Sequence, residues 1–221
     1  RSPVAHGVDA GTHAVLDVAS RRAKAAKILR LVEARRPLAG ARVLDVGTGS
    51  GTIAAALAAA AGHAGAVTSV DIADVRVDRD GYRFVRAEGV ELPFPHAAFD
   101  VALSNHVIEH VGDAAAQAAH LRELARVLAP GGLLYLAVPH RYRLVENHYR
   151  LPLLSWLPPR LADLYVRLAR RGERYDCRLL ARGELARLVA AAGLRGEDAT
   201  REALDATLAL EGGRAARLLA R

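Results

Sequence analysis

Several features are scarce or missing in this chain of 221 residues, and each scarcity excludes a class of protein. The single cysteine, Cys177, allows no internal disulfide, which excludes a disulfide scaffold and a metal cluster built on cysteine. The longest apolar stretch, residues 53–62, is about half as long as a membrane span requires. The start of the chain does not resemble a signal peptide. We therefore expect a cytoplasmic protein.

Basic and acidic residues are unequal in number and unevenly placed. The chain has 31 basic and 24 acidic residues, a net charge of +7, and only Lys24 and Lys27 of the basic set are lysine. Residues 141–182 contain ten arginines against four acidic residues, whereas residues 1–140 contain 15 basic and 14 acidic residues. Because the arginine fork suits anions, the basic segment predicts an anionic partner, which includes a phosphorylated molecule, nucleic acid or a membrane surface.

The composition, with 52% hydrophobic and 25% charged residues, is typical of a globular protein of one large domain. Short β-branched runs alternate with helical patterns, and this alternation predicts an α/β fold with a doubly wound, mostly parallel Rossmann-like sheet and helices on both faces. We expect strands at residues 41–47, 67–72, 82–88, 99–105 and 132–139, and helices at residues 13–36, 52–61, 113–128 and 183–192.

Three segments depart from this alternation. Residues 73–82 are too short and too charged for a crossover helix, so we expect a loop or a single turn. Residues 140–182 form a long insertion, called the lid below, with an amphipathic helix expected from Pro159 to about Arg171. The sequence LDATLAL at residues 204–210 fits either a sixth strand or the start of a helix, and the residues after it look helical.

A glycine-rich loop follows the first expected strand. The sequence VLDVGTGSGT places Gly47, Gly49 and Gly51 between a strand and a helix, where a ligand can lie against backbone N–H groups. Their G-x-G-x-G spacing matches the dinucleotide fingerprint only in part. Asp45 is a charge inside an apolar strand and needs a polar partner, which is either the loop amides or a ligand ammonium group.

These residues resemble the class I S-adenosylmethionine (SAM)-dependent methyltransferases, whose first motif is similar to VLDVGTGSG. The resemblance continues through residues 41–139 in four motifs that occur in order, and FDVALSNHVIEHV at residues 99–111 is similar to the family's fourth strand and following loop. It implies a Rossmann-like fold, SAM as the cofactor and methyl transfer as the reaction.

The resemblance also implies residue roles. Asp71 stands where the family places an acid that grips both ribose hydroxyls, while Glu88, in place of the commoner aspartate, and Gly89 would contact the adenine. Asn105 and His106 would face the methionine part. The candidate cofactor-binding residues are Asp45, Gly47, Thr48, Gly49, Gly51, Asp71, Ile72, Glu88, Gly89 and Asn105.

The catalytic candidates are histidines. An alcohol acceptor must lose a proton, so a histidine at the mouth of the pocket suits the reaction. His148 in the lid is the first candidate, followed by His106 and His140, and a structural role fits each of them equally well.

A zinc pattern is also present. His106, Glu109 and His110 satisfy H-x-x-E-H, in which two histidines on one helix face bind zinc. No third ligand is evident in the sequence, and the methyltransferase resemblance accounts for the same string. We therefore expect no metal.

We divide the single expected domain into an N-terminal helical cap (1–40), a cofactor-binding core (41–139), the lid (140–182) and a C-terminal part that completes the sheet and helices (183–221). The lid would roof the cofactor pocket. Its basic, amphipathic character suits an anionic acceptor and peripheral contact with the inner membrane face.

The expected reaction is methyl transfer to an oxygen, or secondarily a nitrogen, of a small-molecule, glycan or lipid-linked acceptor. One alternative is an RNA methyltransferase whose lid contacts phosphates, although an Asn-Pro-Pro-Tyr type pocket for a flipped base is missing after the fourth expected strand. Another alternative is a SAM-binding module without catalysis.

Overall fold

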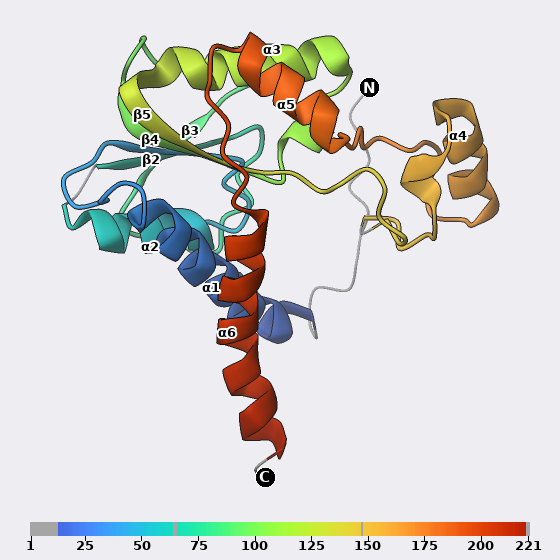
Figure 1. Ribbon diagram of the computed structural model, residues 1–221, viewed down its shortest axis with the longest axis horizontal. Helices are drawn as coiled ribbons and strands as arrows, with labels where there is room; N and C mark the ends of the chain where they lie inside the picture. The colour runs from blue at the N-terminus through green and yellow to red at the C-terminus, as the bar shows by residue number, and fades with distance from the viewer. Residues whose placement is uncertain (1–12, 64–65, 147, 220–221) are drawn as a thin grey trace.

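The computed structural model describes residues 13–63, 66–146 and 148–219, and its centre is one parallel sheet (Figure 1). The strand order is β3-β2-β1-β4-β5, and every neighbouring pair is parallel, as the sequence predicts for most of the sheet. The strands are β1 (Val43–Val46), β2 (Val67–Asp71), β3 (Arg83–Arg86), β4 (Phe99–Asn105) and β5 (Leu128–Ala137).

Helices cover both faces of the sheet, which confirms the doubly wound architecture. In Figure 1, α1, α2 and α6 lie below the sheet, and α3 and α5 lie above it. Two short 3-10 turns, η1 and η2, follow β4 and β5. The elements are α1 (His13–Glu33), α2 (Thr52–Ala61), η1 (Ile108–His110), α3 (Ala114–Val127), η2 (Leu154–Trp156), α4 (Pro159–Leu168), α5 (Arg182–Ala191) and α6 (Thr200–Leu219).

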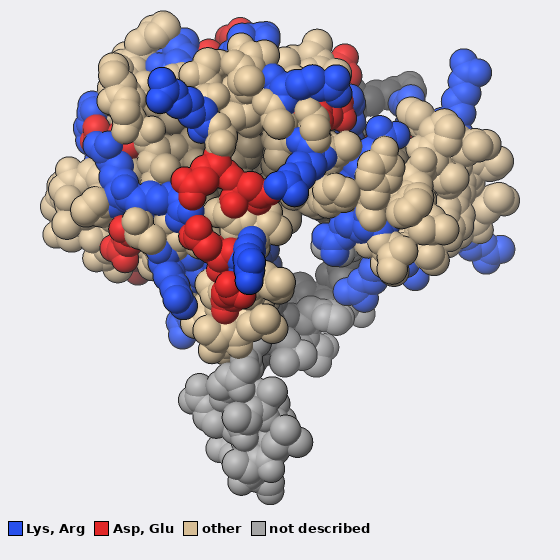
Figure 2. All heavy atoms as spheres, in the orientation of Figure 1, with Lys and Arg blue, Asp and Glu red and all other residues tan. Residues whose placement is uncertain are grey.

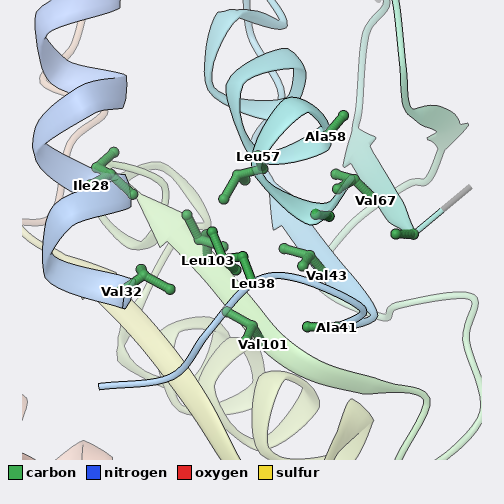
Figure 3. Packing of buried hydrophobic residues seen from close by; sticks show 12 residues of the cluster. Ile28, Val32, Leu38, Ala41, Val43, Leu57, Ala58, Val67, Val101 and Leu103 are labelled. Carbon is green, nitrogen blue, oxygen red and sulfur yellow. The ribbon is translucent and has the colours of Figure 1, made fainter. Parts of the chain in front are cut away.

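Each face of the sheet has its own hydrophobic core. Below the sheet, Ile28 of α1 and Leu57 of α2 pack toward Val43 and Leu103 of the central strands (Figure 3). The opposite core joins the strands to α3 and α5. All four residues of β1 are buried, as expected for a strand covered on both faces, and this burial suits its apolar sequence apart from Asp45.

The boundary between α3 and β5 lies earlier than the sequence predicts. The helix ends at Val127, and Leu128 is already extended and pairs with Phe99 of β4. The next pair joins Val101 to Leu133, so residues 129–132 bulge opposite a single residue of β4. Pro130 and the two glycines after it are typical of a helix end. Here they lie in the bulge, and so they are part of β5.

The expectation that residues 183–221 complete the sheet is wrong for the part of them that the structure describes. Residues 204–210 belong to α6, and residues 182–219 form only α5 and α6 with their connection. Helix α6 packs on α1, and Arg35, two residues after α1, pairs with Glu197 and Glu202 at the start of this segment. Leu204 and Leu208, whose spacing is compatible with a strand, are exposed on this helix. The high helix propensity of this alanine- and leucine-rich segment favours the helical alternative.

The lid forms a lobe with its own small core between β5 and α5. Buried Leu151, Leu154, Ala162 and Val166 pack together there. The amphipathic helix α4 begins at Pro159 as predicted and ends at Leu168, slightly before the predicted end. Figure 1 shows the lobe standing out beyond the carboxyl end of β5. Among the described residues, no helix combines the length and apolarity that a bilayer span needs.

Candidate functional site

The loop between β1 and α2 requires glycine at three positions. Gly47, Gly49 and Gly51 have φ angles of 82°, 50° and 84°, in the left-handed region that favours glycine. A Cβ atom on Gly47 would clash with the Val107 side chain, and one on Gly51 would clash with the Asp78 carbonyl. A Cβ atom on Gly49 would meet open space. The loop is therefore tightly packed on two sides and open at Gly49.

Asp71 lies beside this loop at the end of β2. Its Oδ2 atom accepts a hydrogen bond of 2.9 Å from the Gly49 amide, and its Oδ1 atom accepts a longer one of 3.4 Å from the Ala73 amide. The amides of Gly47 and Thr48 donate to the Val70 carbonyl, which holds the loop against β2. The structure thus brings the predicted ribose-binding acid into contact with the predicted glycine loop.

Asp45 is buried at the base of the loop, with 2% of its surface exposed. Its Oδ2 atom accepts no hydrogen bond from any described residue, so the loop amides leave this oxygen unpaired. Burial and, to a smaller extent, the neighbouring charge of Asp71 together raise the pKa of Asp45 to about 7. A buried, unpaired carboxyl group of this kind suits a cationic partner.

The remaining cofactor candidates lie along the same edge of the sheet. Ile72 follows β2 and is 64% exposed, and Glu88 and Gly89 follow β3 and are also exposed. Thr48 is buried in the loop, and its hydroxyl has no hydrogen-bond partner among the described residues. Asn105 ends β4 and is partly buried.

The sequence does not reveal two supports of this edge. Glu123 of α3 accepts the Leu92 amide at 2.9 Å, and Arg126 donates to the carbonyls of Leu92 and Phe94, which fixes the segment after β3. In the sequence these two charged residues show only an i,i+3 spacing, which is typical of an ordinary ion pair on a helix surface.

The second support is the loop at residues 72–82, which has no helix, as expected. The Thr52 hydroxyl donates to Asp78 at 2.7 Å, and the Ser50 carbonyl accepts the amides of Val77 and Asp78. This loop therefore closes one side of the glycine loop.

His106 directly follows β4 and has a strained backbone. Its φ angle is 59°, which is uncommon for histidine, and its amide donates to the Ala137 carbonyl at the end of β5. Its Nδ1 atom lies 3.4 Å from the Oε1 atom of Glu109. Because η1 spans only Ile108–His110, the two histidines of the H-x-x-E-H pattern do not share an α-helix. The helical zinc geometry is therefore not formed.

The other two histidine candidates lie in the lid. The Nδ1 atom of His148 lies 2.7 Å from Glu146, and this bond raises the pKa of His148. The His148 ring also packs edge-to-face against His110, with the ring centres 4.7 Å apart. His140 accepts the Tyr142 amide at 3.2 Å and so contacts its own turn. The structure thus brings His148, but not His140, against the turn that follows His106.

Comparison with known proteins points to one family. A family model described as a methyltransferase domain matches residues 18–198. A ubiquinone biosynthesis O-methyltransferase from Thiobacillus denitrificans is 32% identical over 183 residues, which cover 78% of this chain and 72% of that protein. A 27-O-demethylrifamycin SV methyltransferase from Amycolatopsis mediterranei is 36% identical over 109 residues, which cover 44% and 38% of the two chains.

The fold comparison agrees. The crystal structure of a SAM-dependent methyltransferase from Aquifex aeolicus has a TM-score of 0.54 and 18% identity, covering 80% of this chain and 90% of that one. At this identity the likeness concerns the fold alone. Together with the family model, it shows that the chain belongs to the class I SAM-dependent methyltransferases and that its cofactor is SAM.

Proposed function

We propose that this enzyme methylates an oxygen atom of a small, lipid-linked, anionic acceptor. The observation that carries the proposal is the lid, which presents exposed apolar side chains and arginines on the same lobe. The names of two relatives, a ubiquinone biosynthesis O-methyltransferase and a demethylrifamycin methyltransferase, support a small-molecule acceptor and, in the first case, oxygen as its reacting atom.

The residues at the sheet edge fit SAM by their chemistry. When bound, SAM supplies an electrophilic methyl group. The buried, unpaired carboxyl group of Asp45 is suited to an ammonium group, and Asp71 is suited to the ribose hydroxyls. The open space above Gly49 lets a ligand approach the backbone. Glu88, Gly89 and Ile72 are exposed further along the edge and complete the proposed binding surface.

His106 is the proposed general base. It lies at the end of β4, next to Asn105, and Glu109 faces its Nδ1 atom. With Nδ1–H directed at the carboxylate, Nε2 is free to accept the proton of an acceptor hydroxyl. Glu109 is then a positioning residue, because it acts through the histidine ring. The strained backbone at His106 is typical of residues held in place for function.

The outer surface of the lid is suited to the lipid part of the acceptor. Leu161, Leu164 and Leu168 have i, i+3 and i+7 spacing, so they share one exposed face of α4. Arginines flank this face in the sequence, and Figure 2 shows basic atoms around a broad uncharged surface on this lobe. A basic amphipathic helix of this kind binds the surface of an anionic membrane. In this proposal the lid binds the membrane surface, and the enzyme takes its lipid-linked acceptor from that membrane.

A transfer assay with three acceptors tests the proposal. We would incubate the enzyme and SAM with an anionic phenol carrying an isoprenoid tail, with the same phenol lacking the tail, and with a structured RNA. We expect an oxygen-linked methyl group on the tailed phenol, located by mass spectrometry, and slower transfer to the tailless one. Preferential methylation of the RNA, or SAM binding without transfer to any acceptor, would contradict the proposal.

A further inference from the structure

Three side chains with metal-ligating atoms meet where the lid joins the sheet. One ligand atom each from His110, His148 and Cys177 lies within 4.8 Å of the others. His110 belongs to η1 after β4, His148 to the first part of the lid, and Cys177 to the segment that returns toward α5. The Sγ atom of Cys177 is 3.7 Å from the Nδ1 atom of His110. Two nitrogens and a sulfur at such separations are the usual ligand types of zinc.

The His148 ring is held by a buried carboxylate. A carboxylate only accepts hydrogen bonds, so the 2.7 Å contact with Glu146 places the proton of His148 on Nδ1 and leaves the Nε2 lone pair free. Glu146 is 1% exposed, and its other oxygen accepts the Tyr149 amide at 2.8 Å. A fixed carboxylate behind a histidine is typical of zinc sites, where it orients the ring and raises its basicity.

Several carboxylates surround the three ligands. Glu109, next to His110 in the chain, is fully buried, and neither of its oxygens has a hydrogen-bond partner among the described residues. Asp176 contacts the Cys177 thiol at 3.5 Å. A bound divalent cation would offset these carboxylates and stabilise the thiolate.

We propose that His110, His148 and Cys177 bind one Zn²⁺ ion and that the ion fastens the lid to the end of β4. The ligands are Nδ1 of His110, Nε2 of His148 and Sγ of Cys177, and a water molecule completes the tetrahedron. Binding breaks the S–H bond of Cys177, forms a Zn–S bond and releases one proton to solvent. Zn–N and Zn–S bonds of about 2.0 and 2.3 Å require the three atoms to approach by roughly an ångström, which side-chain rotations supply.

The proposal explains why the sequence gives a misleading zinc signal. The H-x-x-E-H string contains one ligand, His110, while its other histidine, His106, lies outside η1. The remaining ligands are 38 and 67 residues further along the chain, as the difference between residue numbers shows. The lone cysteine can serve because the fold supplies two histidines beside it.

Metal titration of the full chain tests the site without any methyl acceptor. The protein is first stripped with a chelator and then titrated with Zn²⁺ by calorimetry and with Co²⁺ by absorption spectroscopy. We expect one equivalent of each metal to bind, proton release on binding, and a thiolate-to-cobalt charge-transfer band. Mg²⁺ should not compete, because it prefers oxygen ligands. The absence of stoichiometric binding would overturn the proposal.

Variants assign the ligands. Cys177→Ser should remove the charge-transfer band, His148→Ala should weaken Zn²⁺ binding strongly, and Glu146→Gln should weaken it by about 10- to 100-fold. His96→Ala is the matched control, because His96 is exposed and lies outside the cluster. Circular dichroism checks that each variant is folded. Equal Zn²⁺ affinity in the wild type, Cys177→Ser and His148→Ala would overturn the proposal, whatever acceptor the enzyme methylates.

Discussion

The Nδ1 atom of His106 faces the Oε1 atom of Glu109 at 3.4 Å, and the Glu109 carboxylate is fully buried. The histidine is partly exposed while its partner is not, so the ring has one side fixed by the protein and one side open to a ligand. The pair begins where β4 ends, at the same edge of the sheet as Asp45 and Asp71. The proposed base and the two acids proposed to bind the cofactor therefore come from three neighbouring strands.

Replacing this histidine should affect catalysis and spare cofactor binding. Asparagine tolerates a positive φ, so His106→Asn should keep the local backbone. We expect kcat to fall by about 10²- to 10⁴-fold, the usual contribution of a general base, with an unchanged Kd for SAM by calorimetry. His140→Gln should retain activity, because the His140 side chain accepts the Tyr142 amide in its own turn. An undiminished kcat in His106→Asn would exclude it as the base.

Substitution at the open glycine tests the cofactor site. A valine at Gly49 projects into the space where we place SAM and also strains a backbone with φ of 50°. We expect Gly49→Val to abolish SAM binding in calorimetry, and Asp71→Ala to do the same. Gly131→Ala is the matched control, because Gly131 has φ of 70°, also faces open space, and lies at the start of β5. Retained binding in both site variants would contradict the assignment of the site.

Asp45 should make SAM binding depend on pH. Its pKa of about 7 in the folded protein means that the carboxylate needed for a cationic ligand forms only as the pH rises through 7. We expect SAM affinity to increase between pH 6 and pH 8, measured by calorimetry at both values. Asp45→Asn should lose about tenfold or more in affinity at pH 8, as expected for a lost charged hydrogen bond, and should flatten the dependence.

The raised pKa of Asp45 makes SAM affinity increase with pH, but it makes the stability of the protein without ligand decrease with pH. The folded pKa lies above the unfolded value of 3.8, so the folded state binds more protons. The contribution of Asp45 to stability is therefore fully present below pH 4 and is lost as the pH rises through 7. Asp45→Asn should be more stable than the wild type at pH 8 in urea unfolding. A less stable variant at that pH would show that the carboxylate is paired.

His120 should make the stability of the folded protein decrease as the pH falls. It is buried in α3, its Nε2 atom lies 3.0 Å from the Ser104 hydroxyl, and burial lowers its pKa to about 4. Its contribution is present above the unfolded value of 6.5 and is lost as the pH falls toward 4, by about 3 kcal/mol in all. His120→Gln should show a flatter loss of stability between pH 6.5 and 4 in urea titrations. An unchanged slope would assign the acid sensitivity to other groups.

The exposed face of α4 should control membrane contact. We expect Leu164→Glu and Leu168→Glu to reduce binding to anionic vesicles in a flotation assay by severalfold, because each removes apolar contact and adds repulsion. SAM affinity should not change. Leu208→Glu is the matched control, since Leu208 is similarly exposed on α6. Equal vesicle binding by all three variants would contradict the proposed surface.

Most of the sheet could be predicted from the sequence because its signals are local. The glycine loop and the β-branched strands each act within a few residues, and the structure has all five expected strands. The start of β5 was misplaced because Pro130 and Gly131 signal a helix end but lie in a bulge. The alternatives at residues 204–210 stay open in the sequence because their apolar pattern fits both a strand and a helix, and packing against α1 adds to the helix propensity of the segment.

Part of the candidate site could also be predicted from the sequence, and part could not. The residues of the glycine loop and Asp71 follow adjacent strand ends, so the order of motifs places them together. The junction of His110, His148 and Cys177 depends on how the lid returns to the sheet, where the Arg178 amide donates to the Glu109 carbonyl at 2.8 Å. Such a contact between distant segments has no periodic pattern in the sequence, and the fold alone creates it.

The separate core of the lid also has a consequence for local unfolding. Leu151, Leu154, Ala162 and Val166 pack among themselves, so the lobe has the internal contacts of a cooperative unit. Its amide protons should then exchange with solvent together and at a different rate from those of the buried strands. A chain built in this way can open this lobe locally while the sheet and its two cores stay folded.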